Sequence, residues 1–161
     1  MRIGFDLDGV LFESIEYNGN LKEYNNQISK PKLRLDIDRL LCSNKHDIYI
    51  ITGRAKDNEG ITRKTLKLFL PQFNLNNLIM VNEFDSSKID IAFSDVVSYR
   101  TYIAVRKFIY IIDLKLDYYF EDNPLIIKIL KNVENKSGYR IIDVNDVSSV
   151  NKILDICTGV L

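Results

Sequence analysis

The sequence is poor in cysteine, in net charge and in long hydrophobic runs. Its two cysteines, Cys42 and Cys157, lie far apart without a pairing pattern, which argues against a disulfide-rich secreted domain and predicts a reduced, cytoplasmic setting. The 22 basic and 22 acidic residues cancel, which argues against a broad basic surface that coats nucleic acid. No apolar run approaches the length of a membrane span, so no membrane partner is expected.

The 161 residues fit a single domain over 1–161, because no repeat, low-complexity tract or long linker divides them. Short apolar segments alternate with segments of helical periodicity, which is typical of βαβ units and a parallel sheet. The expected strands are the opening stretch Arg2–Leu11, which begins as a strand, and then Asp47–Ile51, Leu78–Val81, Asp117–Phe120 and Tyr139–Val144. We therefore predict an α/β fold, a three-layer α/β/α sandwich around a central parallel sheet of about five strands.

Helical spacing and end signals predict the intervening helices. One runs from the low 30s to Ser43, and one begins at Asp57 or Asn58 and stops at Pro71. A third begins at Ser98. Its expected inner face consists of Tyr102, Val105, Ile109 and Ile112. The alternation of apolar and polar residues in 83–98 favours an extended piece, such as an edge strand.

Two further helices follow towards the C-terminus. Asn123 as N-cap with Pro124 at the first helical position is a strong start signal, and Gly138 is the expected end. The last helix is marked by Val147 and Val150.

Two aspartates follow the first strand without a packing reason. A strand covered on both faces should be continuously apolar, yet Asp6 and Asp8 share the face opposite to its hydrophobic residues. Gly9 permits a turn with positive φ directly beyond them. We expect a positive partner at this position.

Polar residues also follow two other strands. Thr52-Gly53-Arg54 ends the second strand, and Glu121-Asp122 ends the fourth. Ligands of open α/β sheets bind at the carboxyl ends of the strands, so these side chains should converge with Asp6 and Asp8.

Four motifs in this order resemble the haloacid dehalogenase superfamily of phosphohydrolases. They are Asp6-Leu7-Asp8-Gly9-Val10, Ile50-Ile51-Thr52-Gly53-Arg54, a lysine on the helix before the fourth strand, and Tyr119-Phe120-Glu121-Asp122-Asn123-Pro124. Lys107 best matches the lysine, although Lys88, Lys115 and Arg106 compete with it. Each motif alone is a weak signal, but their joint occurrence at strand ends is not.

The resemblance implies a catalytic role for each motif. Asp6 is the nucleophile that forms an aspartyl-phosphate, and Asp8 protonates the leaving oxygen and then activates the hydrolytic water. Thr52 hydrogen-bonds a phosphoryl oxygen, and Lys107 holds the nucleophile and the phosphate by charge. Dehalogenating relatives lack the second aspartate, so its presence favours phosphoryl transfer.

The acidic residues predict Mg²⁺ as cofactor. Two carboxylates ~4 Å apart repel by about 4 kcal/mol at an effective dielectric of about 20. Asp6, Asp8, Glu121 and Asp122 offer hard oxygen ligands that suit Mg²⁺. The resemblance implies that the metal is held by the first aspartate, the backbone carbonyl of the second and an acid of the fourth motif. The family usually has two adjacent aspartates in that motif, and here the first is Glu121, which leaves open which of the two acids contacts the metal; Asp122 is favoured.

The substrate is less well defined by the sequence. The insertion Phe12–Lys30 is too short for a cap domain, so the cap is minimal and the site is expected to be open. The resemblance is greatest to nucleotidases and polynucleotide phosphatases, which implies a phosphorylated small molecule or a polynucleotide end as substrate. Gly53 and Arg54 would contact it, and Tyr17 or Tyr24 could stack on a base. Monomer and dimer remain open.

Two rival functions come from other classes. A receiver-type signalling domain also uses an acidic cluster, but its nucleophile ends the third strand, where this chain has Val81-Asn82-Glu83. A catalytically silent binding module is disfavoured by retention of all the acids. A phosphomutase is disfavoured by the missing cap.

Overall fold

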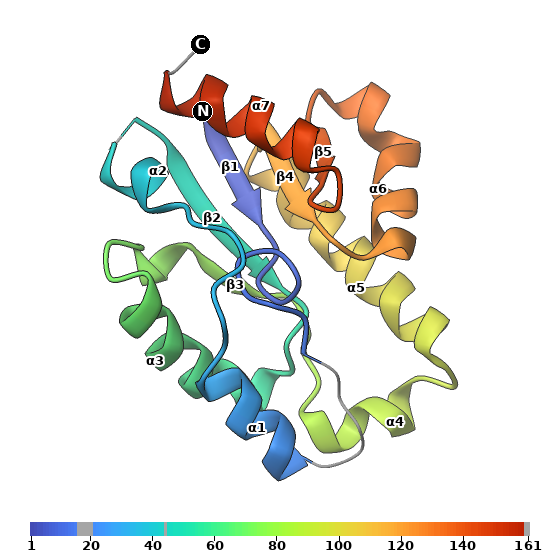
Figure 1. Cartoon of the computed structure of the whole chain (residues 1–161). Coiled ribbons are helices and arrows are strands. Elements are labelled where there is room, and N and C mark those ends of the chain that lie inside the picture. Colours follow the sequence, from blue (N-terminus) through green and yellow to red (C-terminus); the bar gives the residue numbers. More distant parts are fainter. Residues whose placement is uncertain (16–20, 44, 160–161) are drawn as a thin grey trace.

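The computed structural model describes residues 1–15, 21–43 and 45–159, and Tyr17 lies outside them. Five parallel strands form one sheet in the order β3-β2-β1-β4-β5 (Figure 1), which confirms the predicted α/β fold and strand number. The strands are β1 Arg2–Phe5, β2 Asp47–Thr52, β3 Leu78–Met80, β4 Tyr118–Glu121 and β5 Arg140–Asp143.

Seven α-helices lie in the described part of the chain. They are α1 Leu21–Ser29, α2 Asp38–Cys42, α3 Glu59–Phe69, α4 Ile89–Ala92, α5 Val96–Asp113, α6 Pro124–Ser137 and α7 Val147–Thr158. Among the described residues, none of these helices has the length and apolar character needed to cross a membrane.

Helices cover both faces of the sheet (Figure 1). One apolar core joins Ile3 and Phe5 of β1 to α2, α3 and α7. A second core joins Ile51 of β2 and Tyr119 of β4 to α5 and α6. Because helices cover both faces, the central residues of the strands are mainly apolar, as expected of a parallel sheet.

The signals at the ends of α6 are confirmed. The Asn123 side chain accepts hydrogen bonds from the backbone N–H groups of Leu125 and Ile126, and Pro124 is the first helical residue. Gly138 ends the helix with φ +80°, in the left-handed conformation that glycine adopts without steric cost.

The helix expected from the low 30s to Ser43 is wrong in extent, because α2 has only five residues. Before it the backbone is extended: Leu33 forms a bridge with Phe12, and the N–H groups of Arg34 and Leu35 donate to the carbonyl of Leu11. Pairing with the loop after β1 therefore takes precedence over helical periodicity.

The extended piece expected within 83–98 is also wrong. A 3₁₀ turn at Ser86–Lys88 leads into the short helix α4. The alternation arose because Ile91 is 85% exposed, whereas Phe93 packs against other aromatic rings. Because Ile91 faces solvent and Phe93 contacts other rings, these apolar residues do not form one face of a strand.

The predicted inner face of the helix after Ser98 is rotated away from the observed one. The buried residues of α5 are Ile103, Ala104, Lys107 and Ile111, whereas Val105, Ile109 and Ile112 are exposed. The predicted inner face was chosen from apolar residues alone and therefore left out Lys107. The structure instead turns Lys107 inward, where two carboxylates neutralise its charge.

Candidate active site

The loop after β1 places the acidic pair at the carboxyl edge of the sheet. Gly9 has φ +84°, so the predicted turn is present. A Cβ atom on Gly9 would lie 2.0 Å from Oδ2 of Asp122, closer than any real contact. Glycine therefore permits both the turn and the approach of the Asp122 carboxylate to this loop.

Lys107 connects two strand ends through a buried three-residue ion cluster. Its Nζ lies 2.9 Å from Oδ1 of Asp6 and 2.7 Å from Oε2 of Glu121. Lys107 and Glu121 are fully buried, and Asp6 is 8% exposed. The positive partner expected for Asp6 is thus Lys107, held by the inner face of α5.

The three competing basic residues lie elsewhere. Lys88 pairs with Asp85 at 3.7 Å, and Arg106 pairs with Glu83. Lys115 follows the end of α5 and has φ 52°. Of the four candidates, Lys107 lines the cavity that contains Asp6.

Glu121 organises the loop after β4. Its Oε1 accepts hydrogen bonds from the N–H groups of Asp122 and Asn123, at 3.2 and 3.1 Å. Its Oε2 accepts from Lys107 and, at 3.4 Å, from the hydroxyl of Tyr119. Both carboxylate oxygens are therefore engaged, and Asp122 is the less committed of the two fourth-motif acids.

Asp8 forms a bidentate ion pair with Arg54. Nε and Nη2 of Arg54 donate to the two Asp8 oxygens at 2.7 and 2.6 Å, and Nη1 donates to Thr62 at 3.1 Å. Arg54 is only 3% exposed. Sequence reasoning assigned Arg54 to the substrate and missed this pair. The available signal was an arginine at the strand end adjacent to Asp8.

Thr52 and Gly53 complete the wall of the site at the end of β2. Oγ1 of Thr52 accepts a hydrogen bond from the Arg54 N–H at 3.2 Å. The carbonyl of Gly53 accepts from the Tyr99 hydroxyl at 3.0 Å. Both residues line one cavity of about 430 Å³ together with Asp6, Asp8, Lys107, Glu121 and Asp122. The structure thus brings all the predicted site residues to one place.

Burial shifts the acid–base behaviour of the site. It raises the pKa of Asp6 to about 8, an effect that the Lys107 ammonium opposes and the Glu121 carboxylate reinforces. Burial, together with the charge of Glu121, raises the pKa of Asp122 to about 6. The pKa of Lys107 is raised because its two carboxylate partners outweigh its burial. Burial and carboxylate repulsion therefore both favour the protonated forms of Asp6 and Asp122.

The donor set fits a hard divalent cation. Asp6, Glu121 and Asp122 each offer an oxygen, and these oxygens lie within 4.8 Å of one another. Lys107 contacts Oδ1 of Asp6, which leaves Oδ2 for a ligand. The Asp8 carboxylate is turned to Arg54, so it lies outside this group. Asp6 and Asp122 are the residues best placed to hold Mg²⁺.

Comparison of the sequence with protein-family models and with curated proteins gave no match. The motifs and the geometry of these residues are therefore the basis for assigning a function.

Proposed function

We propose that the protein is an Mg²⁺-dependent phosphoric monoester hydrolase of the haloacid dehalogenase type, acting in the cytoplasm. The observation that carries the proposal is the Lys107 bridge between Asp6 and Glu121, with Asp122 and Thr52 in the same cavity. This cavity lies at the carboxyl ends of β1 and β4. The strands β2 and β3 extend the sheet on one side of β1, and the chain then crosses over to place β4 and β5 on the other side. Such a switch point is the usual ligand site of open α/β sheets.

In the first step Asp6 attacks the phosphorus atom in line with the ester oxygen. A bond forms between a carboxylate oxygen of Asp6 and phosphorus, and the bond from phosphorus to the leaving oxygen breaks. Asp8 donates a proton to that oxygen, so the leaving group departs as a neutral alcohol. Thr52 and Lys107 bind the phosphoryl oxygens and keep the group in line.

In the second step water attacks the aspartyl-phosphate. Asp8, now ionised, takes the proton from the water, and the bond between Asp6 and phosphorus breaks to release orthophosphate. Arg54 positions Asp8 for both steps, because it fixes the plane of the carboxylate. One Asp8 oxygen must leave the Arg54 pair to carry the proton.

The carboxylates of Asp6 and Asp122 would hold Mg²⁺, with Glu121 beside them. When bound, the cation neutralises charge on the phosphoryl oxygens. Asp6 must be ionised to attack, and the raised pKa of about 8 means that its burial opposes this at neutral pH. Nearby positive charge is therefore needed in addition to Lys107.

Two features weigh against the receiver-type alternative. Receiver domains have the flavodoxin-like strand order β2-β1-β3-β4-β5, whereas this sheet has β3-β2-β1-β4-β5. Here β3 is an edge strand, and Val81 and Asn82 follow it without an aspartate. The acidic residues instead follow β1 and β4.

A panel of phosphate monoesters tests the proposal. It should include nucleotides and oligonucleotides phosphorylated at the 3′ or 5′ end, because either a nucleotide or a polynucleotide end fits the minimal cap. We expect release of orthophosphate that requires Mg²⁺ and stops with a chelator. Stable phosphorylation by acetyl phosphate without turnover would contradict hydrolysis and revive the receiver function.

A further inference from the structure

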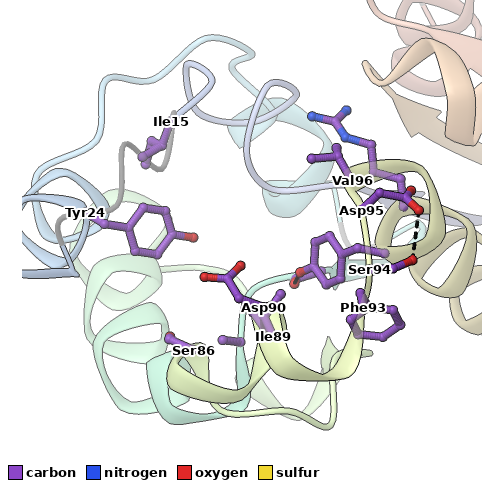
Figure 2. A pocket seen from close by; sticks show the side chains of 13 residues that line it. Ile15, Tyr24, Ser86, Ile89, Asp90, Phe93, Ser94, Asp95 and Val96 are labelled. Carbon is purple, nitrogen blue, oxygen red and sulfur yellow. Dashed lines mark hydrogen bonds between the residues drawn. The ribbon is translucent and has the colours of Figure 1, made fainter.

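A second cavity, shown in Figure 2, has a volume of about 690 Å³ and adjoins the candidate active site through shared lining residues. The two cavities share Ile15, Tyr24, Gly53, Tyr99 and Arg100. A molecule whose phosphate lies at Asp6 can therefore extend directly into the second cavity. Its volume is within the range of about 300–1,000 Å³ that is typical of small-molecule sites.

One wall of this cavity, the aromatic wall, contains the rings of Phe93 and Tyr99. The ring centroid of Phe93 lies 5.4 Å from that of Phe84, 5.3 Å from Tyr99 and 5.1 Å from Tyr102. These contacts fix the orientation of Phe93 at the cavity. Tyr24 lies on the opposite side of the cavity in Figure 2. The two sides together suit a flat ring.

The polar groups of the cavity differ in their availability. Asp95 is committed to the start of α5, because its carboxylate accepts from the N–H and the hydroxyl of Ser98. Asp90 points into the cavity (Figure 2), and within the described residues no hydrogen bond or ion pair engages it. The Asp90 carboxylate can therefore accept hydrogen bonds from hydroxyl or amino groups of a ligand.

On the basis of the proposed phosphatase function, we propose that this cavity binds the leaving group and that the leaving group is a nucleoside. The phosphate lies at Asp6, the base lies against the aromatic wall, and Asp90 accepts hydrogen bonds from sugar hydroxyls or a base amino group. A nucleoside makes use of the volume, the rings and the carboxylate, whereas a short acyclic alcohol reaches only the first cavity. The substrate is therefore a nucleoside monophosphate.

Kinetics with three substrates tests this assignment. Nucleoside monophosphates should show a kcat/KM at least about tenfold above that of glycerol 3-phosphate, which has the phosphate without the ring. A phosphorylated oligonucleotide should be no better than the mononucleotide. Equal rates for glycerol 3-phosphate and the mononucleotides, or a tenfold preference for the oligonucleotide, would overturn the inference.

Two variants localise the effect. Phe93→Ala and the milder Asp90→Asn should each raise the KM for the mononucleotide, and the loss on it should exceed the loss on glycerol 3-phosphate by about tenfold for Phe93→Ala. Asp113→Asn, an exposed change at the far end of α5, makes the same charge change away from the cavity and should preserve the wild-type preference. An unchanged preference in both pocket variants would contradict the assignment.

Calorimetric titration with a nucleoside separates the two proposals. If no monoester is hydrolysed but the nucleoside binds and Asp90→Asn weakens its binding, the phosphatase proposal fails while the nucleoside pocket is supported. If glycerol 3-phosphate is hydrolysed but the nucleoside does not bind, the pocket assignment is wrong and the phosphatase proposal is retained.

Discussion

At the scale of single residues, Lys107 balances two buried carboxylates, Asp6 and Glu121. Lys107→Met keeps most of the side-chain volume but leaves both carboxylates without their cation. We expect unfolding to become easier by about 3–5 kcal/mol, because an uncompensated buried charge is costly. Denaturant unfolding measures this. Lys64→Met, a change of an exposed lysine on α3, should alter stability by less than about 0.5 kcal/mol. Equal effects of the two changes would contradict the burial argument.

Gly9 is the second residue on which the site depends. Gly9→Ala introduces a Cβ at a residue with φ +84°, at a position 2.0 Å from the Asp122 carboxylate. We expect a loss of at least about 1–2 kcal/mol of stability, together with weaker Mg²⁺ binding because Asp122 must move.

The matched control is Gly60→Ala in α3, where a Cβ would meet no atom within 4 Å. Because alanine favours helix, this change should stabilise the protein by about 0.5–1 kcal/mol. Thermal unfolding of both variants tests the contrast. Stabilisation by Gly9→Ala would show that neither the turn nor the Asp122 approach is required.

The sequence identified the acids of the site but not all of their partners. Asp6 and Asp8 were conspicuous because charge at the end of a buried strand has no packing reason. Because Glu121 ends a predicted parallel strand, it was also expected to lie near them. The pairing of Asp8 with Arg54 was not predicted, because the direction of a long side chain depends on packing, here on Thr62 of α3.

At the scale of elements, the N-terminus of α6 supports the acidic loop that precedes it. The Asn123 side chain caps two backbone N–H groups of the first turn. Asn123→Ala should therefore cost about 1 kcal/mol of stability. Asn132→Ala, at an exposed position inside α6, should be neutral or slightly stabilising because alanine is the better helix former. Chemical denaturation of the two variants measures the difference, and equal losses would exclude a capping role.

Strands were predicted better than helix faces. Each strand is a short apolar run that both faces of the sheet bury, so its composition alone identifies it. The face of α5 was wrong because Lys107 lies inside while Val105 and Ile109 are exposed. The prediction for the segment 83–98 was wrong because Phe93 contributes to a cavity wall, whereas Ile91 is exposed. Hydrophobic periodicity does not identify the buried face of a helix where a charged site residue such as Lys107 points inward.

At the scale of the whole molecule, the burial that raises the pKa of Asp122 should make stability depend on pH, and the candidate cation site should make it depend on Mg²⁺. The pKa of Asp122 is raised from 3.8 to about 6, so the folded state binds more protons than the unfolded state between these values. In a chelator, this group should therefore lower stability as pH rises from about 4 to about 6, and Asp122→Asn should remove its contribution.

At neutral pH, millimolar Mg²⁺ should raise the melting temperature, because it binds the folded state preferentially. The increase should be much smaller in Asp122→Asn. Thermal scans with Mg²⁺ and with a chelator provide the comparison. A melting temperature indifferent to Mg²⁺ would count against the cation site.

The most direct test of the account is phosphate release by wild type and Asp6→Asn with a nucleoside monophosphate and Mg²⁺. The substitution preserves the shape of a buried side chain whose ionisation burial already disfavours, so we expect the fold to persist by circular dichroism. Wild type should release phosphate, and Asp6→Asn should be slower by about a thousandfold or more, because the nucleophile is absent. Full activity in a folded Asp6→Asn variant would contradict the assignment of Asp6 as the nucleophile.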